Sequence, residues 1–327
     1  MTTDLKQKIL AAVNDDLIAI ELELRGNLNP HFDLVSQVAG HILFAGGKRL
    51  RPLLMVLCAR LCGYTGDESA RFSTIFEYLH AATLLHDDLV DGSDMRRGRP
   101  VANHVWDNPT AVLTGDFLLA RGLAIAADTG SCDVIQTIAR ITENMSQGEI
   151  RQLERKGDIT LTEAEYMEVI HCKTAVLFQG ACRTGALVAA SPSDTVEALS
   201  DYGHHLGLAF QMADDLLDYT QDLSSMGKNA GADVREGKLT LPLIHTISKA
   251  SEADRRRVLA ILGNPEFSKD DFADLVALLE HHGGIAYTRT QAAEHIRKAK
   301  ATLSSFGHSP TCEVLLNIAD YALIRQS

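Results

Sequence analysis

The sequence has little of what interrupts a helix or builds a sheet. Only 8 prolines and 24 glycines occur among 327 residues, and aromatic residues make up 6% of the chain. Alanine and leucine are plentiful instead, and these residues favour helices over strands. No run shows a convincing alternation of apolar and polar residues. The composition therefore predicts an all-α protein, and its 46% of hydrophobic residues is enough for a large core.

An excess of positive charge is missing as well. The formal net charge is −12 at pH 7, whereas a chain that wraps a nucleic-acid backbone is normally basic. An acidic surface usually contributes only to solubility, but some of the acidic residues of this chain are clustered. We therefore expect no nucleic-acid partner.

The chain also lacks the marks of a secreted or membrane protein. Its first residues, Met1–Asp4, include neither a basic region nor an apolar run of the kind found in secretory leaders. No apolar run approaches the roughly 20 residues that span a bilayer, and nothing resembles a lipid anchor. The 6 cysteines complete no zinc site and are expected to stay reduced. These absences predict a cytoplasmic protein with no transmembrane segment.

Helical periodicity recurs along nearly the whole chain, which predicts about a dozen helices. The longest are expected over residues 67–91, 131–155, 163–189 and 194–220. Three helix starts have a capping residue followed three positions later by an acidic one, at Thr162, Ser251 and Ser268. Because no linker or repeat divides the chain, we expect residues 1–327 to form a single domain, a large helical bundle.

Two acidic clusters follow apolar helical segments. They are Asp87, Asp88 and Asp91 in the first cluster and Asp214, Asp215 and Asp218 in the second. In each cluster the first and last aspartate are four residues apart and share a helix face, where their charges repel unless a cation is bound. Carboxylate oxygens suit Mg²⁺, which completes its coordination shell with water and substrate phosphates. An exposed acidic helix end would explain one such cluster, but two DDxxD runs predict a site for phosphate esters.

Basic residues stand where an anionic substrate would need them. The segment Gly46–Pro52 opens with two glycines, which let the backbone approach a phosphate, and then supplies lysine and arginine side chains. A second basic run, Arg96–Arg99, follows the first acidic cluster, and Lys228 and Lys238 follow the second. Each run alone is typical of a solvated surface. Their placement beside both acidic clusters predicts contacts with a diphosphate.

Together these motifs resemble those of the trans-polyprenyl diphosphate synthases, in the isoprenoid synthase class. The matching segments, in the family's order, are Gly46–Pro52, His80–Pro100, Gly115–Asp116, Lys173–Thr174, Phe210–Asp218 and Lys228–Pro242. The resemblance implies a large helical bundle around a central cavity, usually in a homodimer. It also implies an enzyme in which about three Mg²⁺ ions hold the diphosphate of an allylic substrate.

The resemblance implies a reaction and a role for each matching residue. The allylic C–O bond ionises, isopentenyl diphosphate attacks the cation, and loss of a proton leaves a product longer by one isoprene unit. The residues implied in catalysis are Asp87, Asp88, Asp91, Arg96, Lys173, Asp214 and Lys228. The implied metal ligands are the aspartates of both clusters, Asp87, Asp88, Asp91, Asp214, Asp215 and Asp218. Asp88 suits direct ligation least, because it lies about 100° round the helix from Asp87.

Substrate contacts are implied in the same way. The residues assigned to the allylic diphosphate are Arg96, Lys173, Lys228 and Lys238. The residues assigned to isopentenyl diphosphate are Lys48, Arg51, His80 and Arg97. Thr174 and Gln211 resemble the polar groups that face the reacting carbons.

The helix that leads into Asp87 is expected to line a tunnel for the growing product. Each helical turn is about 5.4 Å long, roughly one isoprene unit. Ala82 and Thr83 lie one turn back, where family members with short products have aromatic residues, and Leu79 and Tyr78 lie further back. The small side chains of Ala82 and Thr83 predict a product of about C30–C50, a precursor of quinone side chains. A phenylalanine at Ala82 is expected to shorten this product. A geranylgeranyl diphosphate synthase with a C20 product is the alternative within the family.

Other classes of protein stay open on the sequence. The runs Glu77–His80 and Glu168–His171 have the Glu-x-x-His spacing of ferritin-like di-iron bundles, but a di-iron site leaves both aspartate clusters unexplained. A terpene cyclase usually has a different second metal motif and needs no isopentenyl diphosphate site. A non-catalytic subunit of a two-component synthase lacks intact aspartate motifs, and this chain has both.

Overall fold

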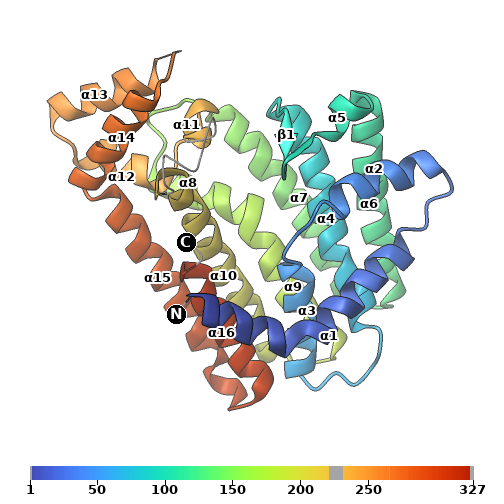
Figure 1. Cartoon of the computed structure of the whole chain (residues 1–327). Helices are drawn as coiled ribbons and strands as arrows, with labels where there is room; N and C mark the ends of the chain where they lie inside the picture. The colour runs from blue at the N-terminus through green and yellow to red at the C-terminus, as the bar shows by residue number, and fades with distance from the viewer. Residues whose placement is uncertain (1, 221–230, 265, 325–327) are drawn as a thin grey trace.

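The computed structural model describes residues 2–220, 231–264 and 266–324, and these residues are almost entirely helical. Figure 1 shows the long helices packed side by side, with α10 between α9 and α15 and with α4 between α3 and α6. The all-α fold predicted from the composition is confirmed.

The helices have the following bounds. They are α1 (Thr2–Leu28), α2 (Asp33–Leu43), α3 (Leu50–Leu61), α4 (Ser69–Val90), α5 (Ala102–Val105), α6 (Asn108–Asp128), α7 (Cys132–Glu154), α8 (Glu163–Ile170), α9 (Val176–Val188), α10 (Ser193–Thr220), α11 (Ala232–Arg235), α12 (Leu241–Lys249), α13 (Glu252–Leu262), α14 (Lys269–His281), α15 (Gly284–Thr302) and α16 (Pro310–Ile324). A π-helical turn, η1 (His171–Ala175), joins α8 to α9, and a 3₁₀ turn, η2 (Leu303–Phe306), follows α15.

Three of the four long helices predicted from the sequence, α4, α7 and α10, begin and end within two residues of their expected bounds. The predicted caps at Thr162, Ser251 and Ser268 all accept a hydrogen bond from the backbone of the first helical turn. The fourth prediction, one helix over 163–189, is wrong in its middle, because η1 interrupts it. A π-helical turn adds a residue to the turn and often marks a functional site; this one contains Lys173 and Thr174.

The expectation that no strand occurs is wrong at one short hairpin. Strands β1 (Met95–Arg96) and β2 (Arg99–Pro100) pair in antiparallel register around Arg97 and Gly98. Both turn residues have positive φ, 51° and 75°, as a tight hairpin turn requires. Strands of two residues are too short to show an alternating pattern in the sequence.

Buried apolar side chains form two clusters. The larger is built mainly by α1–α4, α6, α7, α9 and α16, and the smaller mainly by α8 and α12–α14. Helices α10 and α15 contribute to both, with Leu206 and Ile296 in the larger cluster and Met212 and Ile285 in the smaller. These two helices therefore connect the N-terminal and C-terminal parts of the core.

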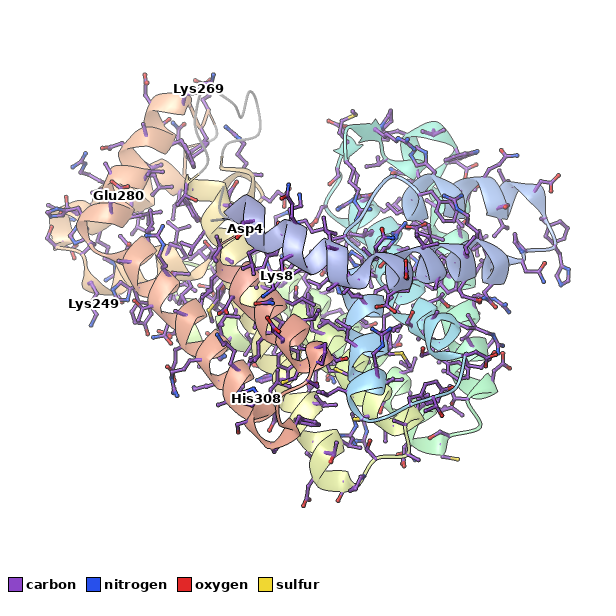
Figure 2. The ribbon with its side chains drawn as sticks, turned by 60° about the horizontal axis from the view of Figure 1, so that its bottom comes forward. Asp4, Lys8, Lys249, Lys269, Glu280 and His308 are labelled. Carbon is purple, nitrogen blue, oxygen red and sulfur yellow. The ribbon has the colours of Figure 1, made fainter. Side chains whose placement is uncertain are left out.

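The two ends of the described chain lie close together. Figures 1 and 2 show α1 crossing α16, and Lys8 of α1 places its Nζ 2.6 Å from Oε1 of Glu313 at the start of α16. Both side chains are exposed, so this ion pair contributes little to stability. The apolar side chains of α1 and α16 in the larger core cluster hold the two helices in place.

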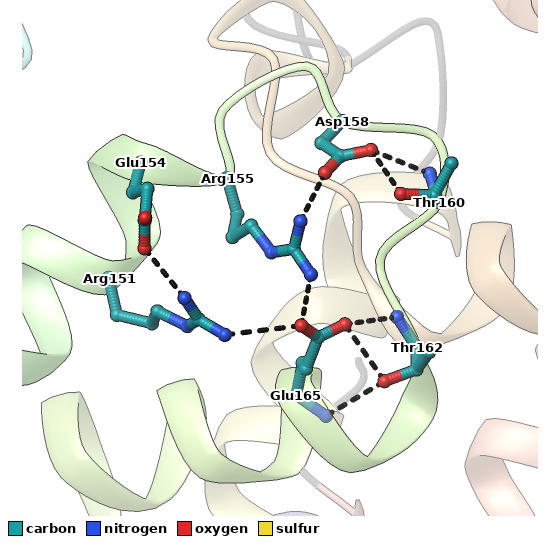
Figure 3. Close-up of polar contacts among 7 residues, drawn as sticks. All are labelled: Arg151, Glu154, Arg155, Asp158, Thr160, Thr162 and Glu165. Atoms are coloured by element: carbon teal, nitrogen blue, oxygen red, sulfur yellow. Dashed lines mark hydrogen bonds and ion pairs between the residues drawn. The ribbon is translucent and has the colours of Figure 1, made fainter.

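The turn between α7 and α8 is fixed by Glu165, as Figure 3 shows. Its Oε2 accepts hydrogen bonds from the backbone N–H and the hydroxyl of Thr162 at 3.0 and 2.9 Å. Its Oε1 accepts hydrogen bonds from Arg151 at 3.2 Å and from Arg155. The backbone hydrogen bond from Thr162, followed by the one from Arg155, lowers the pKa of Glu165 to about 2. The carboxylate therefore stays ionised and keeps α8, which leads into Lys173, in a fixed orientation.

Among the described helices, α6 alone is long and apolar enough to cross a membrane by length and composition. This helix contains Asp116 and Arg121, so it is not an uninterrupted apolar run and does not contradict the expectation of no transmembrane segment. Some 39% of its most apolar window is buried inside the structure. Because a core helix of a soluble protein passes the same test, this finding is weak evidence for a membrane span.

Four histidines lie in a row across η1, α10 and α15, with their rings tilted relative to one another. His171 contacts His204, His204 contacts His205, and His205 contacts His295, with ring centroids 4.9 to 5.1 Å apart. Nδ1 of His205 lies 3.1 Å from Nδ1 of His295, so at least one of these two rings is neutral. Burial is the main cause that lowers the pKa of all four groups, to about 4 for His204 and His295.

We expect this row to make the protein sensitive to acid. Because the folded state lowers these pKa values below 6.5, the unfolded chain takes up protons first as the pH falls. The free energy of unfolding should therefore be highest above pH 6.5 and should decrease towards pH 4. Calorimetric Tm values over this range should fall less steeply for a His204→Gln, His295→Gln variant. The same substitution at His308, an exposed histidine labelled in Figure 2, should leave the slope unchanged.

Candidate active site

A cavity of about 600 Å³ lies where α3, α4, η1 and α10 meet. Most of the side chains predicted for the site line it together: Lys48, Arg51, His80, Thr83, Asp87, Asp91, Arg96, Arg97, Lys173, Thr174, Gln211, Asp214 and Lys238. Residues separated by almost 200 positions in the chain thus face one space. Lys228, also predicted for this site, lies outside the described residues.

The first DDxxD cluster ends α4, and its three aspartates differ in their surroundings. Asp87 and Asp91 face the cavity, and Asp91 has an oxygen 3.3 Å from Nζ of Lys238. Asp88 is buried instead, and its Oδ1 accepts a hydrogen bond of 2.5 Å from Nε of Arg96. The rotation of about 100° per residue that made Asp88 the least suitable ligand thus turns it away from the cavity. Asp88 positions Arg96 on the cavity wall.

The second cluster, at the end of α10, shows a similar division. Asp214 lines the cavity. Asp215 is buried, where its two oxygens accept hydrogen bonds from the hydroxyl of Tyr166 at 2.5 Å and from the side-chain amide of Gln211 at 2.7 Å. The oxygens of Asp218 accept the backbone N–H groups of Ala232 and Asp233, at 3.1 and 3.2 Å. Asp215 and Asp218 therefore accept hydrogen bonds from the protein, whereas Asp214 lies on the wall of the cavity.

The carboxylates of the cavity suit a hard divalent cation. Burial raises the pKa of Asp87 to about 6, and nearby Glu149 and Asp91 also raise it, although Lys173 lowers it. A cation bound beside Asp87 would therefore favour the ionised form of its carboxyl group. Neither DDxxD cluster brings three ligand atoms within 4.8 Å of one another in the described part of the chain. Mg²⁺ is usually held by one or two carboxylates and by substrate phosphates, so an open set of ligands fits this ion.

A chain of hydrogen bonds connects the second cluster with η1. The hydroxyl of Thr174 donates to Oε1 of Gln211 at 2.7 Å, and Gln211 donates in turn to Asp215. Next to it, Nζ of Lys173 lies 2.6 Å from Oε2 of Glu149 on α7. The π-helical turn thus directs Lys173 and Thr174 into the same cavity, as their matching with the family motif implied.

Basic side chains gather on the opposite wall. Arg51 lies over the ring of Phe178, with its guanidinium carbon 4.8 Å from the ring centroid. Arg97 donates a hydrogen bond to the carbonyl oxygen of Gly46. His80 is partly buried on the cavity wall, and burial, followed by the charges of Arg51 and Arg97, lowers its pKa well below the usual value. His80 is therefore neutral at pH 7, and the arginines and Lys48 supply the positive charge of this wall.

A second, more apolar cavity of about 270 Å³ adjoins the first between α4, α6 and α7. Thr83, Asp87, Met145 and Lys173 line both, and the second is continued by apolar side chains such as Leu79. Ala82 and Tyr78, which were also expected at the tunnel, are fully buried and are absent from the walls of both cavities. The hydroxyl of Tyr78 donates instead to the carbonyl oxygen of Leu24 on α1, at 2.8 Å.

The geometry agrees with what comparison with known proteins shows. A sequence profile of the polyprenyl synthetase family matches residues 32–279. The chain belongs to this family. Octaprenyl diphosphate synthase of Escherichia coli (strain K12) is 36% identical over 321 residues, 98% of each chain. The all-trans-nonaprenyl-diphosphate synthase (geranyl-diphosphate specific) of Rhodobacter capsulatus is 37% identical over 329 residues, 99% of each chain.

Solved structures of polyprenyl synthetases have the same fold. A decaprenyl diphosphate synthase from Rhodobacter capsulatus superposes with a TM-score of 0.92 at 38% identity, over 98% of this chain and 99% of that one. A polyprenyl synthase from Caulobacter crescentus CB15 has a TM-score of 0.91 at 38% identity, over 98% of each chain. As a polyprenyl synthetase the chain is a prenyltransferase.

The di-iron interpretation is therefore wrong for this polyprenyl synthetase. In the part of the chain that the structure describes, the two Glu-x-x-His runs do not form a group of ligand atoms close enough to share one metal ion. Glu77 forms an ion pair of 2.5 Å with Arg49, and His171 belongs to the histidine row. The spacing in the sequence arises from unrelated packing on two helices.

Two side chains that line the larger cavity or hold one of its neighbouring aspartates were missed in the sequence. Asp233 lines the catalytic cavity, and burial, followed by the charges of Asp215 and Asp218, raises its pKa well above the usual value. It was detectable as the acidic residue between Gly231 and the basic loop that contains Lys238. Tyr166, which holds Asp215, had no comparable signal, because a tyrosine on an amphipathic helix is usually a packing residue.

Proposed function

We propose that this polyprenyl synthetase condenses an allylic diphosphate with successive molecules of isopentenyl diphosphate to give an all-trans polyprenyl diphosphate of about C30–C50. Such a product is a precursor of quinone side chains. The alternative, a C20 geranylgeranyl product, is less favoured, because the octaprenyl and nonaprenyl synthases above are 36% and 37% identical, whereas a geranylgeranyl pyrophosphate synthetase from Pyrococcus horikoshii is 30% identical.

One observation supports the proposal above all. The cavity lined by Asp87, Asp91, Asp214 and the basic wall adjoins a more apolar cavity, with Thr83 and Met145 in the wall of both. A charged compartment for diphosphates and an apolar one for a hydrocarbon chain thus meet at Asp87. This is the arrangement that elongation of a prenyl chain needs.

The chemistry proposed for the side chains follows from their positions. Mg²⁺ ions, about three by family resemblance, would be held chiefly by Asp87, Asp91 and Asp214 and would neutralise the charge that develops on the leaving diphosphate. Lys173 and Lys238 would donate charge-assisted hydrogen bonds to the same group. Thr174 and Gln211, which are hydrogen-bonded to each other on the cavity wall, would lie beside the allylic carbons and stabilise positive charge there. The apolar side chains around Thr83 would exclude water from the cation.

We further propose that the chain works as one domain in a cytoplasmic homodimer. Exposed apolar side chains on α6 and α7, among them Leu113 and Ile150 at 65% and 67% exposure, support a second copy as the partner. Burial of such side chains between two subunits is a general source of stability in homodimers. The same burial would account for the apolar surface of α6 without a membrane span.

Incubation with labelled isopentenyl diphosphate, farnesyl diphosphate and Mg²⁺ tests the proposal. Chromatography of the dephosphorylated products should show chains of about C30 or longer, and EDTA should abolish them. Products that end at C20 would support the alternative and place the end of the tunnel near Leu79. No incorporation with any allylic starter would overturn the proposal.

The two diphosphate sites should be separable by mutation. Lys48→Ala is expected to raise KM for isopentenyl diphosphate by about 10- to 100-fold, because a charged hydrogen bond is lost. KM for the allylic substrate should change by less than about 3-fold, because Lys173 and Lys238 lie on the other wall. Steady-state kinetics with each substrate varied in turn gives both values. An equal rise in both KM values would contradict the assignment.

A further inference from the structure

Arg49 stands in the middle of the basic loop and borders the same cavity as Lys48 and Arg51, yet two carboxylates engage its side chain. Its backbone has φ 47° and ψ 33°, the left-handed region that residues other than glycine seldom adopt. It is only 5% exposed. An unfavourable backbone conformation persists where the surrounding contacts enforce it, so the contacts of this arginine decide the shape of the loop.

The guanidinium group of Arg49 connects three helices. Its Nε donates to Oε1 of Glu21 on α1 at 2.5 Å, and its Nη1 donates to Oε1 of Glu77 on α4 at 2.5 Å. Its Nη2 donates to the carbonyl oxygen of Leu43 at the end of α2, at 2.6 Å. Three directed hydrogen bonds from one planar group fix its orientation, which a lysine could not reproduce.

In the sequence, Arg49 lies between Lys48 and Arg51, two of the four residues assigned to isopentenyl diphosphate. Lys48 precedes Arg49 and Arg51 follows it by two positions, and both line the catalytic cavity with His80. Glu77 and His80 are three residues apart on α4 and therefore share a helix face. The ion pair thus ties the basic loop to the helix that leads to Asp87. Arg49 and Glu77 border the same cavity, but the carboxylates of Glu77 and Glu21 already accept hydrogen bonds from Arg49 and offset its charge.

We propose that Arg49, held by Glu77 and Glu21, is a positioning residue for the isopentenyl diphosphate site. The anchored loop presents Lys48 and Arg51 to the diphosphate, while Arg49 itself makes no contact with substrate. The inference rests on the proposed function, in which this loop binds isopentenyl diphosphate.

Substitution of the partner distinguishes positioning from direct contact. Glu77→Gln keeps the shape of the side chain and releases Arg49 from its buried ion pair. If Arg49 positions the loop, KM for isopentenyl diphosphate should rise by about 10-fold or more. If Arg49 bound the substrate directly, its released charge would lower KM or leave it unchanged, and that result would overturn the proposal. Arg49→Lys keeps the positive charge but loses the planar guanidinium group and its three directed hydrogen bonds. It should raise KM for isopentenyl diphosphate by about 30-fold.

The allylic substrate provides the internal comparison. Its KM should change by less than about 3-fold in both variants, because its side of the cavity is built by η1 and α10. An equal rise in both KM values would mean a general loss of structure and would overturn the proposal. The matched control is Arg60→Lys, since Arg60 also joins α3 to α1, through Asp16, but is exposed. It should change neither KM.

Two further measurements keep the test decisive. Far-UV circular dichroism and Tm establish whether each variant folds. If Glu77→Gln does not fold, Glu21→Gln replaces it, because Glu21 is the other, more exposed partner of Arg49. The expected rise in KM for isopentenyl diphosphate is then smaller. Lys48→Ala is measured in parallel. A rise in KM with Lys48→Ala but not with the Arg49, Glu77 and Glu21 variants would overturn this inference alone. No rise with Lys48→Ala would overturn the assignment of the loop as well.

Discussion

Replacing Asp87 by asparagine is expected to lower kcat/KM for chain elongation by about 1,000-fold or more, because a metal-binding carboxylate that acts on the leaving group is lost. The same change should leave the fold as stable as before or stabilise it. Burial raises the pKa of Asp87 to about 6, so the folded state disfavours the ionised form. The free energy contributed by this group is therefore lost as the pH rises through 6, and asparagine, which has no charge, avoids that loss.

Two measurements at pH 8 check this prediction. Single-turnover kinetics with saturating Mg²⁺ gives the loss of activity, and thermal unfolding in EDTA gives the effect on stability. Asp270→Asn is the matched control, because Asp270 is an exposed aspartate on α14 that lies outside both cavity walls. It should retain nearly full activity. A folded Asp87→Asn enzyme with more than about a tenth of wild-type activity would contradict the role given to Asp87.

Thr83→Phe is expected to shorten the main product from C30 or longer to about C15–C20, since the substitution falls one turn of about 5.4 Å from Asp87. Thr83 lies where the catalytic and apolar cavities meet, and its hydroxyl already donates to the carbonyl oxygen of His80 at 2.8 Å. A phenyl ring there would fill the junction and block the path of the growing chain. Geranyl diphosphate, as a short starter, allows the shortened products to form.

Ala82→Phe on the same helical turn is the comparison for Thr83→Phe. Because Ala82 is fully buried outside both cavity walls, a larger side chain should overpack the core and lower Tm. The product length of the enzyme that still folds should stay unchanged. If Ala82→Phe shortens the product and Thr83→Phe does not, the hydrocarbon chain follows the other face of α4.

Local sequence patterns were sufficient for much of the fold and for the central residues of the site. Helix periodicity located α4, α7 and α10, and the helical angle between neighbours indicated that Asp88 would turn away from Asp87. The DDxxD runs and the basic loops are each contiguous in the chain, so their chemistry is visible without a structure. Their meeting in one cavity could be expected only from the family resemblance.

Features that depend on distant parts of the chain were not predictable. Arg49 and Glu77 are 28 residues apart, and Tyr166 and Asp215 are 49 residues apart. Nothing in the local pattern of either residue reveals its partner. The spacing also places Ala82 and Thr83 one turn before Asp87 on α4, but it does not show which of the two side chains faces the tunnel. Packing decides that, because it buries Ala82 in the core and leaves Thr83 on the walls of both cavities.

The shared wall of the two cavities has a consequence for how synthesis ends. Because Thr83 and Asp87 border both spaces, each new isoprene unit is added at the diphosphate end while older units move into apolar surroundings. Burial of one unit is worth about 4 kcal/mol, at about 0.8 kcal/mol per CH₂. Elongation thus draws the chain inward, and every unit added makes escape into water slower. The finished product should therefore leave efficiently only where a lipid or another apolar acceptor can receive it.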